Sequence, residues 1–418
     1  MGEVFTAFLR LGLTAFGGPV VHIGYFRDEF VRRRGWLDDT AYADLVALCQ
    51  FLPGPASSQV GIGLGLMRAG LPGALAAWCA FTLPSALLMG LAAFSLIGLG
   101  AALPEGMLAG LKAVVVGVVA HALVGMAGSL TPDARRRALA FAALVLALVL
   151  GGISGQLAAI GLGAVAGALL LSPAGAGGGA GEAGSPLRGI RRRTGAIPVA
   201  VAIALLLALP LLARFQAETQ GALPLAIADG FYRAGALVFG GGHVVLPLLE
   251  AETVRAGHVD AAAFTAGYGL AQAVPGPLFT FSAYLGGVAG LAAGLSAPAA
   301  AMLAALALVM IFLPGALLVV GLLPWWGSLR ASAVARRTLN GVNAAVVGIL
   351  AAALYDPVLL TAVDDAGDIA IALAAWAALA LLHWPAWAVV PMGAGLGIAL
   401  AQLPPGLVPG FVPGLAGG

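Results

Sequence analysis

Two copies of a helix-breaking motif lie inside apolar stretches of this chain. Pro53-Gly54-Pro55 recurs in the second half as Pro275-Gly276-Pro277. A helix that restarts after such a break leaves the N–H groups of its first turn unpaired and carries a partial positive charge there. We predict that both motifs and the polar side chains after them bind an oxyanion; these side chains are Ser57, Ser58, Gln59, Thr280 and Ser282. The alternative is a plain kink whose hydroxyls cap the new helix.

Two arginines lie within apolar segments, each six residues before a Phe-Gly pair, at Arg10 and Arg233. A charge at membrane depth is costly and usually functional. Because a guanidinium can bind a tetrahedral oxyanion through two parallel hydrogen bonds, we predict that both arginines contribute to anion binding. The alternatives are that they reach the membrane interface, or that they pair with Glu3 or Asp229.

The remaining site candidates are polar residues and glycines that occur in pairs, one in each half. For anion binding they are Lys112 with Asn343, Gln50 with Gln272, and the breaks Gly17-Gly18 and Gly240-Gly241. The alternatives are that Lys112 extends to the membrane surface and that the glutamines brace the loops. The candidates for proton coupling are Asp44, Asp229, His22 and His243, each of which has a structural alternative.

The composition defines the kind of fold that positions these residues. Only 9% of the 418 residues are charged, against about 25% in soluble proteins, and the mean hydropathy is +1.03. Apolar stretches repeatedly exceed the ~18 residues of a membrane-spanning helix. We therefore predict an all-α polytopic membrane protein, and the composition excludes a soluble enzyme, a disordered chain and a β-barrel.

Several kinds of chemistry are excluded by residues that the chain lacks. Its single lysine, Lys112, follows Gly-Leu and precedes Ala, so no Walker A motif can bind a nucleotide. Cys49 and Cys79 have no metal-ligand spacing, and the histidines are scattered. We therefore predict no enzyme activity, no cofactor and no metal, and energy must come from a gradient or a partner.

The two halves of the chain repeat each other in four blocks that keep the same order. The matched segments are 8–19 with 231–242, 35–55 with 257–277, 81–88 with 311–318, and 110–117 with 341–348. We predict repeats at 1–171 and 224–402. They are separated by a linker at 172–195 and a connecting transmembrane helix at 196–212, and a tail follows at 403–418.

Charge in matched loops has opposite sign in the two repeats. Loop 27–38 carries four arginines, whereas 250–260 carries one beside three acids; loop 130–137 carries three arginines, whereas 355–368 carries four aspartates and no base. Because positive loops favour the cytoplasm, we predict inverted-topology repeats with a cytoplasmic N-terminus and a periplasmic C-terminus.

This topology requires nine full crossings and four broken or re-entrant elements. The crossings are 71–99, 107–129, 138–151, 153–171, 196–212, 297–323, 332–353, 369–384 and 386–402. The re-entrant elements are 3–26, 39–70, 224–248 and 262–294. Non-helical backbone at membrane depth is tolerated only inside protein or beside water, so the breaks should face an internal site.

The paired motifs Phe16-Gly17-Gly18-Pro19 and Gln50-Phe-Leu-Pro53-Gly54-Pro55, with their counterparts from Phe239 and Gln272, resemble the chromate ion transporter (CHR) family in its long, two-domain form. The resemblance implies chromate export across the bacterial inner membrane, driven by the proton-motive force, and chromate resistance. Arg10, Arg233 and both kinds of break fall on the family's motif positions. It implies chromate or sulfate and membrane lipid as partners, with a homodimer as a candidate assembly and no nucleic acid.

Three alternatives remain at this point. Uptake or exchange of sulfate, or of a related oxyanion, is the nearest one. A membrane redox enzyme would need a redox centre, and two separated cysteines do not supply one. A non-transporting subunit should lack polar groups at the helix breaks, whereas this chain carries them in both halves.

Overall fold

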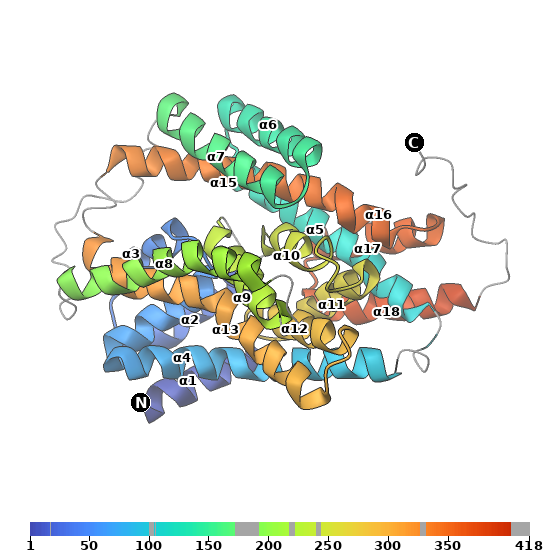
Figure 1. Ribbon diagram of the computed structural model, residues 1–418, viewed down its shortest axis with the longest axis horizontal. Coiled ribbons are helices and arrows are strands. Elements are labelled where there is room, and N and C mark those ends of the chain that lie inside the picture. The colour runs from blue at the N-terminus through green and yellow to red at the C-terminus, as the bar shows by residue number, and fades with distance from the viewer. Residues whose placement is uncertain are drawn as a thin grey trace.

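The computed structural model describes residues 1–16, 18–99, 104, 106–171, 192–216, 222–239, 244–326 and 332–402. Within them, six helices are long and apolar enough to cross a membrane, which confirms the all-α polytopic membrane fold. They are α4 (Ala56–Leu99), α5 (Met107–Leu130), α7 (Gly152–Leu170), α8 (Arg192–Gln216), α13 (Ala297–Leu322) and α15 (Ala333–Ala353). Figure 1 shows α4, α8, α13 and α15 running along the long axis of the molecule.

Three further predicted crossings coincide with shorter helices. They are α6 (Ala134–Leu150), α17 (Ala366–Ala380) and α18 (Ala386–Ala401), of 17, 15 and 16 residues. A straight crossing of the hydrocarbon core takes about 20 residues at about 1.5 Å each. The count of nine crossings therefore stays a prediction.

Helices end at each of the predicted breaks. In the first half, α1 (Gly2–Thr14) is followed by α2 (Gly18–Phe26), and α3 (Asp39–Phe51) by α4. In the second half, α9 (Ala222–Leu237) is followed by α10 (Val245–Thr253), and α11 (Ala261–Ala273) by the 3₁₀ turn η4 (Leu278–Thr280) and α12 (Phe281–Ala292). The predicted helix restarts at Ala56 and Leu278 are confirmed. Whether these elements enter and leave on one side of a membrane stays a prediction.

Short irregular turns join the remaining elements. They are the π-helical segments η1 (Arg27–Arg33) and η6 (Leu354–Leu359), the 3₁₀ turn η5 (Leu323–Trp325) and the short α16 (Leu360–Ala362). Residues 172–191 of the predicted linker (172–195) and the predicted tail at 403–418 lie outside the described residues, and the last four linker residues belong to α8.

Helix α4 consists of two antiparallel arms. Its backbone leaves the helical region at Ala69 (φ −144°) and Gly70 (φ +67°). A Cβ on Gly65 would lie 2.3 Å from the carbonyl oxygen of Gly73, a contact that eight residues of continuous helix would prevent. The arms are therefore 56–68 and 71–99, and the predicted boundary at residue 70 is confirmed.

Each half of the chain completes its packing with helices from the other half. Helix α5 packs on α17 and α18, and the equivalent α15 packs on α6 and α7 (Figure 1). The contacts are close because glycines meet. A Cβ on Gly110 would lie 2.2 Å from the oxygen of Gly393, and one on the matched Gly341 would lie 2.0 Å from that of Gly163. Small residues at such interfaces let helices in membranes approach closely.

Candidate functional site

Two hydrogen bonds connect the breaks of one half to those of the other. The Gly54 N–H donates to the Val238 carbonyl oxygen at 2.7 Å, and the Gly276 N–H donates to the Ala15 carbonyl oxygen at 2.8 Å. Val238 and Ala15 each lie just before a Phe-Gly break. Each Pro-Gly-Pro loop therefore meets the Phe-Gly segment of the opposite half.

His22 contacts both the first Phe-Gly break and the helix that follows the first Pro-Gly-Pro loop. Its ring nitrogens lie 3.2 Å from the Ala15 oxygen and 3.4 Å from the Ser57 hydroxyl, and the side chain is fully buried. Ala15 belongs to the first Phe-Gly break, and Ser57 to the helix after the first Pro-Gly-Pro loop. Helix ends from both halves are thus gathered at one place, where His22, predicted as a proton carrier, also has a structural role.

Glycine is required at the centre of each Pro-Gly-Pro loop. Gly54 has φ +119° and Gly276 has φ +95°, values that other residues rarely adopt. A Cβ on Gly54 would lie 3.1 Å from the Cα of Gly315, and one on Gly276 would lie 2.7 Å from the Ser85 hydroxyl. Gly315 and Ser85 are matched residues that follow Pro314 and Pro84. Each loop is therefore packed against the proline kink of the other half.

The polar groups after the first break are buried and incompletely paired. The Gln59 amide nitrogen donates to the Pro53 oxygen at 2.8 Å and to the Gly315 oxygen at 3.3 Å, which braces the loop. The Ser58 hydroxyl and the other amide atom of Gln59, Oε1, have no hydrogen-bond partner in the described structure. Buried polar groups are rarely left in this state without a reason.

The polar groups after the second break are satisfied locally. The Thr280 hydroxyl donates to the Pro277 oxygen at 2.9 Å, and the Ser282 hydroxyl donates to the Phe279 oxygen at 2.8 Å. Neither hydroxyl caps the new helix, because each donates to a carbonyl oxygen and accepts no backbone N–H of the first turn. The two breaks are therefore equivalent in position but not in available hydrogen-bond donors.

Two further buried donors lie on α4 and were missed in the sequence. Trp78, Thr82 and Ser85 follow the spacing i, i+4, i+7 and so share one helix face. That face meets the second half, because the Trp78 ring lies 5.8 Å from that of Phe312 and Ser85 adjoins Gly276. Within the described residues, Trp78 Nε1 and Thr82 Oγ1 are buried without a partner. Both residues lie close to Pro84, which is matched by Pro314 in the second half, and this proximity could have identified them from the sequence.

The matched arginines lie in different environments. The Arg233 Nη2 atom lies 3.0 Å from an Asp229 oxygen and 2.7 Å from a Glu252 oxygen, so one predicted alternative, pairing with Asp229, is realised. Arg10 is exposed on α1, and its side chain forms no hydrogen bond or ion pair with any part of the chain that is described. Glu3, its predicted alternative partner, instead contacts Arg34 and Arg68.

Lys112 is anchored to the aspartate-rich segment of the second half. Its ammonium group donates to the Thr361 oxygen at 2.8 Å and lies 3.8 Å from Asp364. The matched Asn343 has a buried side-chain oxygen that finds no partner among the described residues. One member of the pair is thus charged and the other neutral, and the lysine charge is already partly balanced.

The remaining candidates are only partly brought together. Gln50 is exposed, whereas Gln272, Asp44 and Gly18 are half-buried. Gly17, Gly240, Gly241 and His243 lie outside the described residues. No group of three or more His, Cys, Asp or Glu side chains in the described part of the chain could hold a metal ion.

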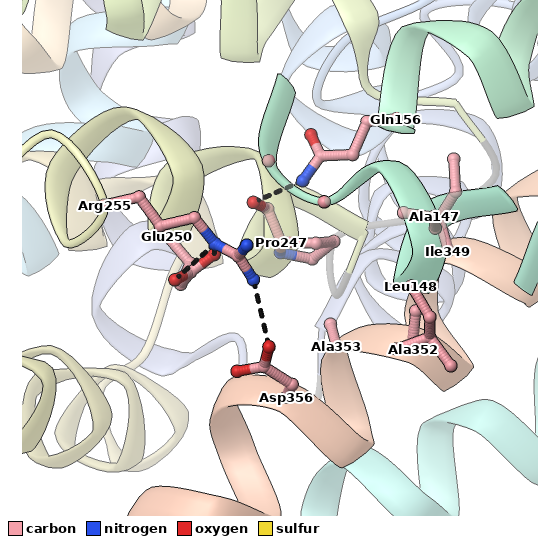
Figure 2. Close-up of a pocket in the computed structure, with 12 residues that line it drawn as sticks. Ala147, Leu148, Gln156, Pro247, Glu250, Arg255, Ile349, Ala352, Ala353 and Asp356 are labelled. Carbon is pink, nitrogen blue, oxygen red and sulfur yellow. Dashed lines mark hydrogen bonds and ion pairs between the residues drawn. The ribbon is translucent and has the colours of Figure 1, made fainter. Parts of the chain in front are cut away.

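A separate cavity of about 40 Å³ lies among α6, α7, α10 and α15 (Figure 2). Figure 2 shows Arg255 between Glu250, at 3.0 Å, and Asp356, at 3.3 Å. Across the cavity, the Gln156 amide donates to the Pro247 oxygen at 2.7 Å. Because two carboxylates face one guanidinium here, the cavity repels anions and is a poor oxyanion site.

The six long apolar helices indicate an integral membrane protein, and the match to a transporter family indicates a transporter rather than an enzyme. The chain belongs to the chromate transporter family. The sequence model of that family, described as Chromate transporter, matches residues 2–168 and again residues 225–398.

Relatives of nearly full length carry the same description. The chain is 30% identical over 415 residues to a chromate transport protein of Pseudomonas aeruginosa, covering 94% of this chain and 91% of that protein. It is 30% identical over 377 residues to a chromate transport protein of Cupriavidus metallidurans, covering 90% and 86%. A probable chromate transport protein of Synechococcus elongatus is 27% identical over 352 residues, covering 83% and 82%. No solved structure matches the chain.

Proposed function

We propose that this protein is a secondary transporter of the bacterial inner membrane that exports chromate, uses the proton-motive force and confers chromate resistance. The observation that carries the proposal is the pair of crossed hydrogen bonds, Gly54 to Val238 and Gly276 to Ala15. They gather broken helix ends from two repeats at one position, the arrangement in which transporters bind their substrates. Family membership and the names of the relatives support chromate as the anion.

The proposed anion site uses mainly neutral donors. The helix that begins at Ala56 offers free N–H groups, and the unpartnered hydroxyls of Ser58 and Thr82 and the indole N–H of Trp78 lie on the helix arms beside it. Neutral donors replace the hydration of an oxyanion and still allow its release. The hydroxyls of the second break are already bonded to carbonyl oxygens, so this break contributes to the site through its backbone and not through side-chain donors.

A dianion also requires positive charge. Two helix N-termini supply about one unit charge together. Arg10 and Arg233 are the basic residues that the repeat provides, but Arg233 is shared between two carboxylates, which leaves Arg10 as the available charge. Arg10 lies five residues before Ala15, or about 7.5 Å along the helix axis, within reach of a long side chain.

The repeats are proposed to have inverted topology, with the N-terminus in the cytoplasm. The loop charges carry this part of the proposal. Compartment reporters fused after Arg34 and after Arg255 should report the cytoplasm and the periplasm, respectively. The same compartment for both would contradict inversion.

Everted membrane vesicles test the transport proposal, because export then becomes uptake into the vesicle. Respiring vesicles that contain the protein should accumulate labelled chromate, an uncoupler should abolish this, and excess sulfate should compete. Vesicles from cells without the protein are the control. Accumulation of sulfate with exclusion of chromate would favour the sulfate alternative, and uptake that is insensitive to the uncoupler would contradict the energy source.

A further inference from the structure

Two buried carboxylates share a single guanidinium nitrogen beside the second Phe-Gly break. Asp229 Oδ2 and Glu252 Oε2 lie 3.0 Å and 2.7 Å from Arg233 Nη2. The two acid side chains are 8% and 9% exposed, and the second oxygen of Asp229 has no partner among the described residues. Gly230 allows this approach, because a Cβ there would lie 2.9 Å from the Glu252 oxygen. We name Asp229, Arg233 and Glu252 the acid pair cluster.

The acid pair cluster has one negative charge in excess if both acids are ionised. A buried charge without a counter-charge is strongly unfavourable, so such a group takes up a proton instead. Two carboxylates at hydrogen-bond distance from one atom also repel each other, which favours one shared proton.

Among the described residues, no neighbouring element supplies a second buried cation. Arg214 on α8 is exposed, and although it acts on Asp229, solvent screens its charge. Helix α13 contains no ionisable residue. Beyond Glu252, α10 and the turn after it bring Glu250 and Arg255, which pair with each other.

The helices that pack on α10 bring no cation to the part of α10 that they contact, because α15 meets α10 near Ile349 to Ala353. Helix α7 has no ionisable residue, and those of α15 are Arg336 and Arg337, in its first two turns. The excess negative charge therefore remains with Asp229 and Glu252.

We propose that the pair Asp229 and Glu252 binds one proton and that this proton raises the affinity of the anion site. This inference rests on the proposed function for the identity of the anion. Arg233 lies five residues before Val238, whose oxygen accepts the hydrogen bond from Gly54. Protonation removes one of the two negative charges that compete for Arg233 and that repel an anion at the break. Reciprocally, anion binding draws a proton onto the pair.

This coupling is compatible with export. Chromate carries two negative charges, so its exit together with one proton still moves one negative charge out of the cell. An inside-negative membrane potential therefore drives the exit of the pair.

Chromate binding to the purified full-length protein tests the inference. Its affinity is measured between pH 6 and 9 for the wild type, Glu252→Gln and Asp229→Asn. The matched control is Glu250→Gln, which removes a buried carboxylate from the same helix. Chromate itself takes up a proton in weak acid, but this affects all four proteins alike. Relative to the two acid-pair variants, wild type and Glu250→Gln should gain affinity on acidification, by up to tenfold per pH unit for one linked proton. Equal pH dependence in all four proteins would overturn the inference.

Infrared spectroscopy tests proton binding without any anion. A protonated carboxyl band should appear in the wild type and in Glu250→Gln as the pH falls, and should be lost in Glu252→Gln and Asp229→Asn. Persistence of the wild-type band in both acid-pair variants would overturn the inference. If the wild type binds no chromate but shows this band, the proposed function fails while the proton site stands.

Discussion

The two halves of this chain place matched glutamates in opposite charge environments. Glu29 and Glu252 stand at the same offset as Arg10 and Arg233. Both side chains are about 10% exposed, but Glu29 binds two arginines, Arg33 and Arg34, whereas Glu252 and a second acid share one arginine.

One substitution between the repeats accompanies this difference. Thr6 stands where the second half has Asp229. The acid at that position draws Arg233 inward, and its absence leaves Arg10 exposed. A repeat can thus conserve a fold while one side chain changes which charges are balanced.

The largest expected difference between the two halves is in the loss of stability when the matched arginine is replaced. Arg233→Gln leaves two buried carboxylates without their cation, which should cost about 3 kcal/mol. Arg10→Gln removes an exposed side chain without a partner and should change stability by less than about 0.5 kcal/mol. Membrane abundance and thermal unfolding in detergent measure both. Equal stability of the two variants would mean that the acid pair cluster is not balanced by Arg233.

Arg10 should matter for the rate of transport, although its loss has little effect on stability. Arg10→Gln should reach the membrane normally but lower chromate uptake into everted vesicles at least about tenfold, because the available charge is lost. Arg10→Lys should recover only part of the rate, since an ammonium lacks the planar fork. Normal uptake by Arg10→Gln at normal abundance would show that Arg10 is not the charge that balances the anion.

The hydroxyls after the two breaks give a smaller contrast. Ser58→Ala or Thr82→Val should weaken chromate binding about 10- to 150-fold, because a hydrogen bond to a charged group contributes about 1.5–3 kcal/mol. Ser282→Ala is the matched control and should bind normally, since its hydroxyl is bonded to Phe279. Equal losses at Ser58 and Ser282 would show that the anion contacts both breaks alike.

Acidification should reveal the smallest contrast, at Glu29. Burial acts to raise the pKa of Glu29, but the hydrogen bonds and charges of Arg33 and Arg34 outweigh it and hold the pKa below its usual value. Its stabilising contribution is therefore present above the unfolded pKa of about 4.3 and is lost as the pH falls through the lower folded pKa. Wild type should exceed Glu29→Gln by less than about 1 kcal/mol at pH 7 and match it near pH 3. A constant difference across this range would contradict the ionised state.

Local features of the fold were predictable from the sequence. Proline and glycine act on their own backbone, so the breaks around residues 53–55 and 275–277 and the turn at Gly70 follow from residue types alone. The spacing of apolar segments likewise predicts the helices, because the bilayer sets their length.

Features that depend on tertiary neighbours were not predictable in this way. Nothing local indicates that Gly54 bonds to Val238, or that Glu252 reaches Arg233 across the second break. Trp78 and Thr82 stand in a largely apolar arm of α4, and their lack of partners among the described residues depends on their position against the second half. The pairing of Arg233 with Asp229, four residues away on the same helix, was one predicted alternative, whereas Glu252 comes from another helix and was not predicted.

The crossed hydrogen bonds also have a mechanical consequence. Each half forms a hydrogen bond to the Pro-Gly-Pro loop of the other half. Neither half can therefore tilt without affecting both contacts. A rotation of one half that pulls Gly54 away from Val238 also acts on the hydrogen bond between Gly276 and Ala15. The two contacts are therefore mechanically coupled. In the proposed transport cycle, this coupling would tie opening of the pathway on one face of the membrane to closure on the other.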